Sequence, residues 1–383
     1  MGITYDVSVC SPVPQPPRGL PGLAGTGSAS TVPADTVPAD TGPAGIALAN
    51  TAGVWRRSWI AVGHAGEIPD NTPVQVLLGG DAWVLTRMDG VLTAFDDHCP
   101  HRRSPLSAGS VTRAEDGSAR LSCAFHGWRF DAEGQCDLMP EVDRGGHAHG
   151  GHHHHRWPAR RAGHGRYADR GSRDLDTSLR AAHGVVERYG LVWLAAEEPL
   201  APLPEFPEWG DGTAGRAACQ SVTVHASARQ VIDGLLDEVP HEVPDEVATG
   251  EWRVTGVWRA PGLDDGDPVA VRRAVKTAGP HASAHLRLEL PQATIGILVS
   301  CQPEDWGTTR VYKLVTHSGL ATGTAAMNKF TRDESRVLAD GLSDLAGPAS
   351  PALPLAGPVG GRAGQLSLAW RRLMARAAGL PPG

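Results

Sequence analysis

Apolar and polar residues alternate in short runs from Trp55 onward, the period-two pattern that is typical of β-strands. The runs predict strands at residues 74–78, 82–86, 91–95 and 185–194. Asp89-Gly90 and Asp116-Gly117 are typical of hairpin turns, because Asp and Gly tolerate the positive φ angles that such turns need. The first half of the chain is therefore predicted to be all-β.

The second half of the chain mixes strand patterns with amphipathic helical patterns. Helices are predicted at residues 226–236, 325–345 and 366–380. Strands are predicted at residues 221–225, 252–258, 269–275, 285–290, 294–301 and 309–316. This order indicates an antiparallel sheet that packs against a long helix, so the fold class of the whole chain is α+β.

Shifts in composition suggest the domain boundaries. Residues 1–52 are rich in Pro, Ala, Gly and Thr, bury too little apolar surface to fold, and are expected to be a disordered tail. One domain is predicted at 53–200, interrupted by a His- and Arg-rich flexible insertion at 144–173, and a second at 201–345. Residues 346–383 are predicted to be a Gly/Pro linker followed by a C-terminal helix.

Charge and composition exclude several classes of partner. The formal net charge is −7 and basic residues form no long run, so a nucleic-acid partner is not expected. No apolar run approaches the ~18 residues of a membrane helix, and the N-terminus lacks the pattern of a signal peptide. The six cysteines are scattered, which fits a reduced protein of the cytoplasm better than a disulfide framework.

Two short segments contain the strongest chemical signal. Cys99-Pro-His101 and Cys123-Ala-Phe-His126 each combine one thiol with one imidazole, and 21 residues separate the two segments. Two Cys and two His are the ligand set of a Rieske [2Fe–2S] centre, in which thiolates hold one iron and imidazoles hold the other. These four residues are therefore the candidate cluster ligands.

A structural zinc site is the main alternative for this ligand set, because zinc also binds two Cys and two His. Zinc motifs usually pair Cys with Cys and His with His in sequence, whereas each segment here contains one of each. The mixed halves favour two loops that each give one ligand to each iron.

These segments and their flanking residues resemble the N-terminal half of Rieske non-haem iron ring-hydroxylating oxygenases, in their α (terminal oxygenase) subunits. Cys-Pro-His-Arg with Leu106, and Cys-x-x-His-Gly-Trp-x-Phe ending at Phe130, are similar to the cluster loops of that family. The resemblance extends over residues 55–194. It implies an all-β Rieske domain, a helix-grip catalytic domain, a cluster covered by Trp128, and a homotrimer.

The resemblance also implies a mononuclear Fe(II) site, which in this family uses a D-x-x-H-x4-H helix and a later carboxylate. Residues 233–246 lie at the expected place but match the pattern imperfectly, because Asp237 and His241 are four residues apart and Glu246 stands where the second His is expected. The candidate iron ligands are His241, Glu246 and either Asp333 or Glu334. By the same resemblance, Asp237 is the acid that connects the iron site to a neighbouring cluster.

The predicted function is a terminal oxygenase that hydroxylates or demethylates a small apolar or aromatic molecule with dioxygen. Electrons must come from a separate ferredoxin or reductase, because no G-x-G-x-x-G follows a strand in this chain. One alternative is a Rieske electron-transfer protein, or a decayed paralogue, without a working mononuclear iron site. Another is metal sequestration by the His tract, although a solvated insertion is the simpler interpretation.

Overall fold

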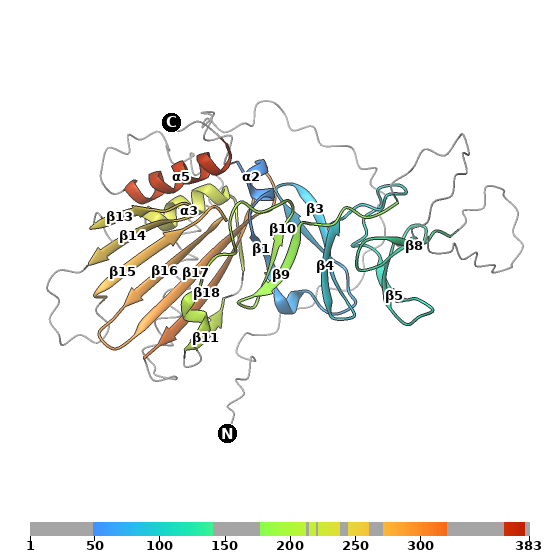
Figure 1. Cartoon of the computed structure of the whole chain (residues 1–383), viewed down its shortest axis with the longest axis horizontal. Coiled ribbons are helices and arrows are strands. Elements are labelled where there is room, and N and C mark those ends of the chain that lie inside the picture. The colour runs from blue at the N-terminus through green and yellow to red at the C-terminus, as the bar shows by residue number, and fades with distance from the viewer. Residues whose placement is uncertain are drawn as a thin grey trace, which may run out of the picture. The chain divides into compact units, whose positions relative to one another are not determined.

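The computed structural model of this chain describes residues 49–140, 177–211, 214–219, 221–237, 244–259, 271–319 and 364–379. Residues 1–48 of the predicted tail, the His-rich insertion, the helix at 325–345 and most of the linker after it lie outside the described residues. The prediction that the tail extends to residue 52 is wrong, because Asn50 is fully buried and hydrogen-bonded. The described residues form antiparallel sheets with a few short helices, which confirms the predicted α+β class (Figure 1).

Three small sheets come from the first half of the described chain. The first has the order β1-β10-β9, the second β2-β3-β4, and the third β5-β6-β7-β8. Their strands are β1 (Ile60–His64), β2 (Val74–Leu78), β3 (Asp81–Met88), β4 (Val91–Asp96), β5 (Ser110–Arg113), β6 (Ala119–Ser122), β7 (Arg129–Phe130), β8 (Cys136–Leu138), β9 (Gly184–Arg188) and β10 (Leu191–Ala195). The helix α2 (Gly53–Arg56) precedes them, and the turn η2 (Ala65–Glu67) follows β1.

The strand predictions for β2, β3 and β4 are confirmed, whereas the single strand predicted at 185–194 is wrong. That segment forms the hairpin β9–β10, in which Arg188 pairs with Leu191. Tyr189 and Gly190 have φ angles of 60° and 75°, which is the geometry of a tight two-residue turn. Tyrosine is not a typical residue for this turn, and apolar residues stand on both sides of it. The sequence pattern therefore did not indicate that the chain reverses there.

The fourth sheet has eight strands and forms the second half of the molecule. Its order is β11-β18-β17-β16-β15-β14-β13, and β12 also pairs with β18. The strands are β11 (Gly215–Ala218), β12 (Val222–Val224), β13 (Glu246–Thr249), β14 (Val254–Arg259), β15 (Arg273–Ala278), β16 (Ser283–Glu289), β17 (Thr294–Pro303) and β18 (Thr309–Ser318). The 3-10 turn η3 (Pro207–Gly210) connects the small sheets to this one.

Two helices, α3 (Ala228–Asp237) and α5 (Gln365–Ala377), pack against each other and on one face of this large sheet (Figure 1). The start of α3 is capped twice. Ser227 and Gln230 form a reciprocal pair of hydrogen bonds, and the Ala228 N–H donates to the side-chain oxygen of Asn50 at 2.8 Å. Because Asn50 also donates to the Thr309 hydroxyl, the segment before the first strand ties α3 to β18.

The face of the large sheet that lies opposite α3 and α5 packs against the small sheet β1-β10-β9. Trp193 of β10 shares a buried cluster with Tyr312 and Leu314 of β18, and Phe206 closes it. Strand β17 is therefore buried along nearly its whole length, because α3 covers one side and the small sheet covers the other. This explains the apolar run from Ile295 to Val299 in the middle of β17.

Replacing Leu314 with Ala is expected to lower the free energy of unfolding by about 3 kcal/mol, because the truncation leaves a cavity in this fully buried cluster. Chemical denaturation measures the change. Leu368→Ala on α5 is the matched control, since Leu368 is 42% exposed and its truncation should change stability by less than about 0.5 kcal/mol. Equal effects of the two variants would contradict the described packing.

Candidate Rieske metal centre

The two candidate ligand loops have the same backbone design. In the first, the Cys99 N–H donates to the Ser104 carbonyl and the Arg103 N–H donates back to the Cys99 carbonyl, at 2.9 and 2.8 Å. In the second, the bonds from Cys123 to Trp128 and from Gly127 to Cys123 have the same spacing, at 2.8 and 3.0 Å. Each loop is thus a tight turn that begins at a cysteine.

The fifth residue of each turn adopts a left-handed backbone. Arg103 has φ of 54° and Gly127 has φ of 69°, so the chain reverses at the same point in both loops. Glycine takes this conformation without strain, whereas arginine adopts it at some cost, which the closing hydrogen bonds offset. Each histidine stands two or three residues after its cysteine, so it lies inside the turn, before the reversal.

The two thiols are buried. Cys99 and Cys123 are 2% and 4% exposed and share a small core with Leu106, Leu121 and Phe130. Burial, together with the neighbouring Cys123 thiol, raises the pKa of Cys99 to about 11. Without metal these are two apolar thiols side by side, and a bound cation would favour their thiolate form.

The two imidazoles meet at the surface end of the loops. The ring centroids of His101 and His126 are 4.7 Å apart, and His101 stacks on Trp128 at 4.9 Å with an interplanar angle of 2°. The ring centroids of Phe125 and His126 are 3.9 Å apart, and Phe125 is 57% exposed. Burial and the charges of His126 and Arg102 lower the pKa of His101, so its neutral, metal-binding form is favoured.

Asp97 anchors the first loop. Its buried carboxylate accepts hydrogen bonds from the Ser107 N–H and hydroxyl at 2.7 and 2.6 Å, and from the Gln75 amide at 2.6 Å. Ser107 lies at the far end of the loop and Gln75 belongs to β2. The carboxylate therefore holds the loop closed against the second small sheet.

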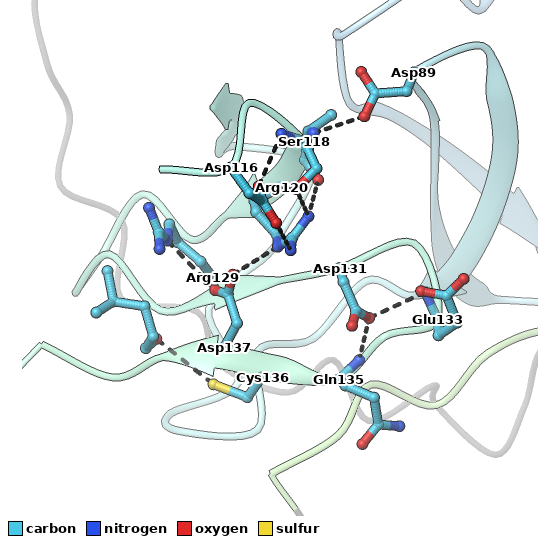
Figure 2. A network of polar contacts seen from close by, with 12 residues as sticks. Asp89, Asp116, Ser118, Arg120, Arg129, Asp131, Glu133, Gln135, Cys136 and Asp137 are labelled. Carbon is cyan, nitrogen blue, oxygen red and sulfur yellow. Dashed lines mark hydrogen bonds and ion pairs between the residues drawn. The ribbon is translucent and has the colours of Figure 1, made fainter. Parts of the chain in front are cut away.

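Ion pairs and capped turns brace the second loop (Figure 2). Arg120 of β6 and Arg129 of β7 both contact the Asp137 carboxylate of β8, at 2.6 and 3.4 Å. Asp131 caps the turn between β7 and β8 by accepting from the backbone N–H groups of Glu133 and Gln135. The hairpin that contains Cys123 and His126 is thus fixed from both sides.

These four side chains fit a Rieske cluster, which needs two thiols and two imidazoles from separate loops. Within the described ranges no group of three or more His, Cys, Asp or Glu is placed to hold a single metal ion. When bound, such a cluster supplies one-electron transfer at a comparatively high potential.

The candidate ligands of the mononuclear iron are less completely described. His241, Asp333 and Glu334 lie outside the described residues, and so does the side chain of Asp237 at the end of α3. Glu246 begins the edge strand β13, where its exposed carboxylate lies 3.8 Å from the Arg259 guanidinium. The structure does not bring Glu246 together with a described histidine, and these assignments stay predictions.

Helix α3 contains a buried acid that the sequence reasoning missed. Asp233 is 4% exposed, and both its carboxylate oxygens accept from the Arg371 Nε of α5 at 3.0 Å. Counted from Asp233, the spacing D-x-x-H-x4-H reaches Leu236 and then His241 without a gap. This register, counted from the earlier acid, would have revealed that a buried leucine stands at the first ligand position.

Similarity to known proteins agrees with the geometry of the cluster loops. The sequence model of the Rieske [2Fe-2S] domain family matches residues 58–152 of this sequence, so the chain contains a Rieske domain. The oxygenase subunit of 5,5'-dehydrodivanillate O-demethylase from Sphingobium sp. is 33% identical over 155 residues, which cover 40% of this chain and 30% of that protein. In eight curated relatives the matched segments span only 13 to 44% of the relative's length.

Solved structures match over a larger part of the chain. Pseudomonas putida CBB5 NdmA with caffeine has a TM-score of 0.63 and 18% identity, and the match covers 84% of this chain and 90% of that one. Dicamba monooxygenase with non-heme iron and dicamba has a TM-score of 0.56 and 19% identity, covering 85% and 98%. The chain shares the fold of these structures, and the predicted resemblance to Rieske oxygenase α subunits is confirmed.

Asp97→Asn is expected to lower the free energy of unfolding by about 2 kcal/mol and to reduce the bound cluster, because an amide cannot accept all three hydrogen bonds. Iron and sulfide analysis and the visible spectrum after anaerobic reconstitution measure the cluster. Asp96→Asn is the matched control, since Asp96 is partly exposed and bonds only to His98 among side chains. A full cluster in Asp97→Asn would show that the loop closes without the carboxylate.

Proposed function

We propose that this chain is the terminal oxygenase component of a Rieske system and that it oxidises a small apolar or aromatic molecule with dioxygen. The observation that supports this most directly is the meeting of two buried thiols and two surface imidazoles from two matching turns. Cys99, His101, Cys123 and His126 would hold the cluster. Relatives named as a demethylase, a monooxygenase and a dioxygenase support hydroxylation or demethylation as the reaction.

The partners follow from the same proposal. A separate ferredoxin or reductase supplies electrons one at a time, and the exposed Phe125 beside His126 leaves the imidazole end of the site open to the surface. A homotrimer in the cytoplasm is the proposed assembly and location. Among the helices that the structure describes, none combines the length and apolarity needed to cross a membrane.

The mononuclear iron site would use His241 and Asp333, with Glu334 and Glu246 as further candidates and Asp237 as the connecting acid. When bound, Fe(II) with open coordination positions supplies dioxygen activation. The buried Asp233 and the place of Leu236 in the pattern support the proposal that α3 leads into this site. His241 follows α3 by four residues, at the spacing that the second histidine of the pattern requires.

Metal analysis tests the oxygenase proposal. The anaerobically reconstituted protein is expected to hold about three irons per chain, two in the cluster and one mononuclear. His241→Ala should lose one iron and keep the paramagnetic resonance signal of the reduced cluster. His225→Ala, at an exposed histidine of the second domain, should keep all the iron.

A second candidate function is electron transfer without oxygen chemistry, and two observations on α3 favour it. Leu236 is 1% exposed and occupies the position where the pattern requires the first histidine. Asp233 is held by Arg371, with Arg229 3.9 Å away, so its carboxylate is already paired with cations. For this candidate the expected content is about two irons per chain, in wild type and His241→Ala alike.

Leu236→His decides between an intact and a lost iron site. If His241 and Asp333 are in place, a histidine at this position completes a two-His, one-carboxylate set and should increase the affinity for Fe(II) at least tenfold. Isothermal titration with Fe(II) under anaerobic conditions measures the affinity. Leu235→His is the matched control, because it places the imidazole one residue out of register on the same helix. An equal response of both variants would exclude this geometry.

A further inference from the structure

A cavity of about 570 Å³ lies between the segment 201–208 and the large sheet. Its floor belongs to three neighbouring strands. Thr277, His285 and Leu298 are directly opposed across β15, β16 and β17, so their side chains share one sheet face, and all three line the cavity. The volume lies within the range of about 300–1,000 Å³ that is usual for small-molecule pockets, and it is large enough for a two-ring aromatic molecule.

The segment 201–208 is fixed in place above the cavity. The Tyr189 hydroxyl donates to the Pro204 carbonyl at 3.2 Å and accepts from the Phe206 N–H at 3.1 Å. Phe206 packs closely on the sheet at Gly296, where a Cβ atom would lie 2.9 Å from the ring. Three prolines within the segment also restrict its backbone. The cavity is therefore supported by the fold, because the segment cannot easily collapse onto the sheet.

The buried charged groups of the lining are paired with one another. Glu208 Oε1 accepts from Arg287 at 2.9 Å, and Glu208 Oε2 lies 3.0 Å from His285 Nε2, where solvent does not reach it. Arg287 also donates to Glu289 at 3.1 Å. Burial opposes ionisation of Glu208, but the contacts with His285 and Arg287 outweigh it and lower the pKa of Glu208 to about 2. These pairs therefore persist at neutral pH.

The other polar groups of the lining add no buried charge. His281 contacts the Ser283 hydroxyl through Nδ1 at 2.9 Å, and burial lowers the pKa of His281 to about 4, so this imidazole is neutral at pH 7. Glu205, Glu251 and Arg253 are exposed, and the Arg253 guanidinium lies 3.9 Å from the Glu205 carboxylate. These three side chains form the outer rim of the cavity, where water screens their charges.

The remaining lining is apolar and selects against ions. Leu203, Val275 and Leu298 form the walls, and Trp252, which is 40% exposed, lies at the rim. A charged molecule that enters loses its hydration and meets buried charges that already have partners, so its transfer is unfavourable. A neutral aromatic molecule loses little hydration and removes apolar surface from water, which favours its binding.

We propose that this cavity binds a small neutral aromatic molecule and discriminates against charged molecules of the same size. The rings of the ligand would lie against Val275 and Leu298 below the segment 201–208, and Trp252 would cover their outer edge. Binding of this kind needs neither the cluster nor a mononuclear iron, so it does not rest on the proposed oxygenase function.

Isothermal titration calorimetry of the full-length protein with 1-naphthalenemethanol tests the site, with 1-naphthoate and protonated 1-naphthylmethylamine as anionic and cationic probes of similar size. The neutral probe should bind at least tenfold more tightly than either ion. Val275→Trp should weaken binding of the neutral probe at least tenfold, because the indole fills the cavity. Val91→Trp is the matched control, since Val91 is 56% exposed and lies outside the cavity lining, and it should leave binding unchanged.

Trp252→Ala keeps the proposal testable if Val275→Trp fails to fold, since Trp252 lies on an exposed bend. It should weaken binding of 1-naphthalenemethanol about threefold and leave the cluster content unchanged. Equal binding of the three probes would overturn the proposal, and so would binding of the neutral probe that neither variant weakens. Neither result depends on the oxygenase reaction, because the measurement is of binding alone.

Glu208→Gln tests the reason why ions are excluded. The substitution removes one carboxylate from Arg287 and His285, so 1-naphthoate should bind at least fivefold more tightly than to the wild type, while 1-naphthalenemethanol binds within about twofold of the wild-type affinity. Unchanged binding of 1-naphthoate by the folded variant would show that the paired charges do not set the preference, and would overturn that part of the proposal.

Discussion

The geometry of the metal centre depends on one constraint, the closure of two separate turns by the same pair of backbone hydrogen bonds. Each turn starts at a buried cysteine and reverses at its fifth residue, Arg103 or Gly127. Because the two cysteines are fixed in a small apolar core, the imidazoles that follow them are directed to the surface end. The remaining contacts in this region, from Asp97 to the ion pairs of Asp137, hold those two turns in place.

That the candidate cluster ligands come together could be predicted from the sequence, because each thiol and its imidazole lie within one short turn. The spacing in the sequence therefore limits how far apart the two side chains of each loop can be. The short alternating strands β2 to β4 were predictable for the same reason, since each is paired to its neighbour by a short hairpin or turn. The hairpin at Tyr189 was not, because tyrosine in a left-handed conformation leaves no compositional signal.

The mononuclear site is the opposite case, because its geometry depends on residues far apart in sequence. Asp233 is recognisable as a structural acid only when Arg371, 138 residues later, lies beside it. A carboxylate so paired can keep a helix in place whether or not iron binds nearby. The cluster motif can therefore remain complete while the ligand pattern of α3 changes, which is the combination that this chain shows.

The shared core limits how the two halves of the chain can be separated. Val62 and Leu194, from the small sheets, belong to the same buried cluster as Val299 and Val311 of the large sheet. Cutting the chain between the halves would expose this apolar surface on both fragments, and would remove Asn50 from the start of α3. The Rieske half is consequently not interchangeable by itself, and a chimaera that takes this half from a relative must also take the residues of the large sheet that pack against it.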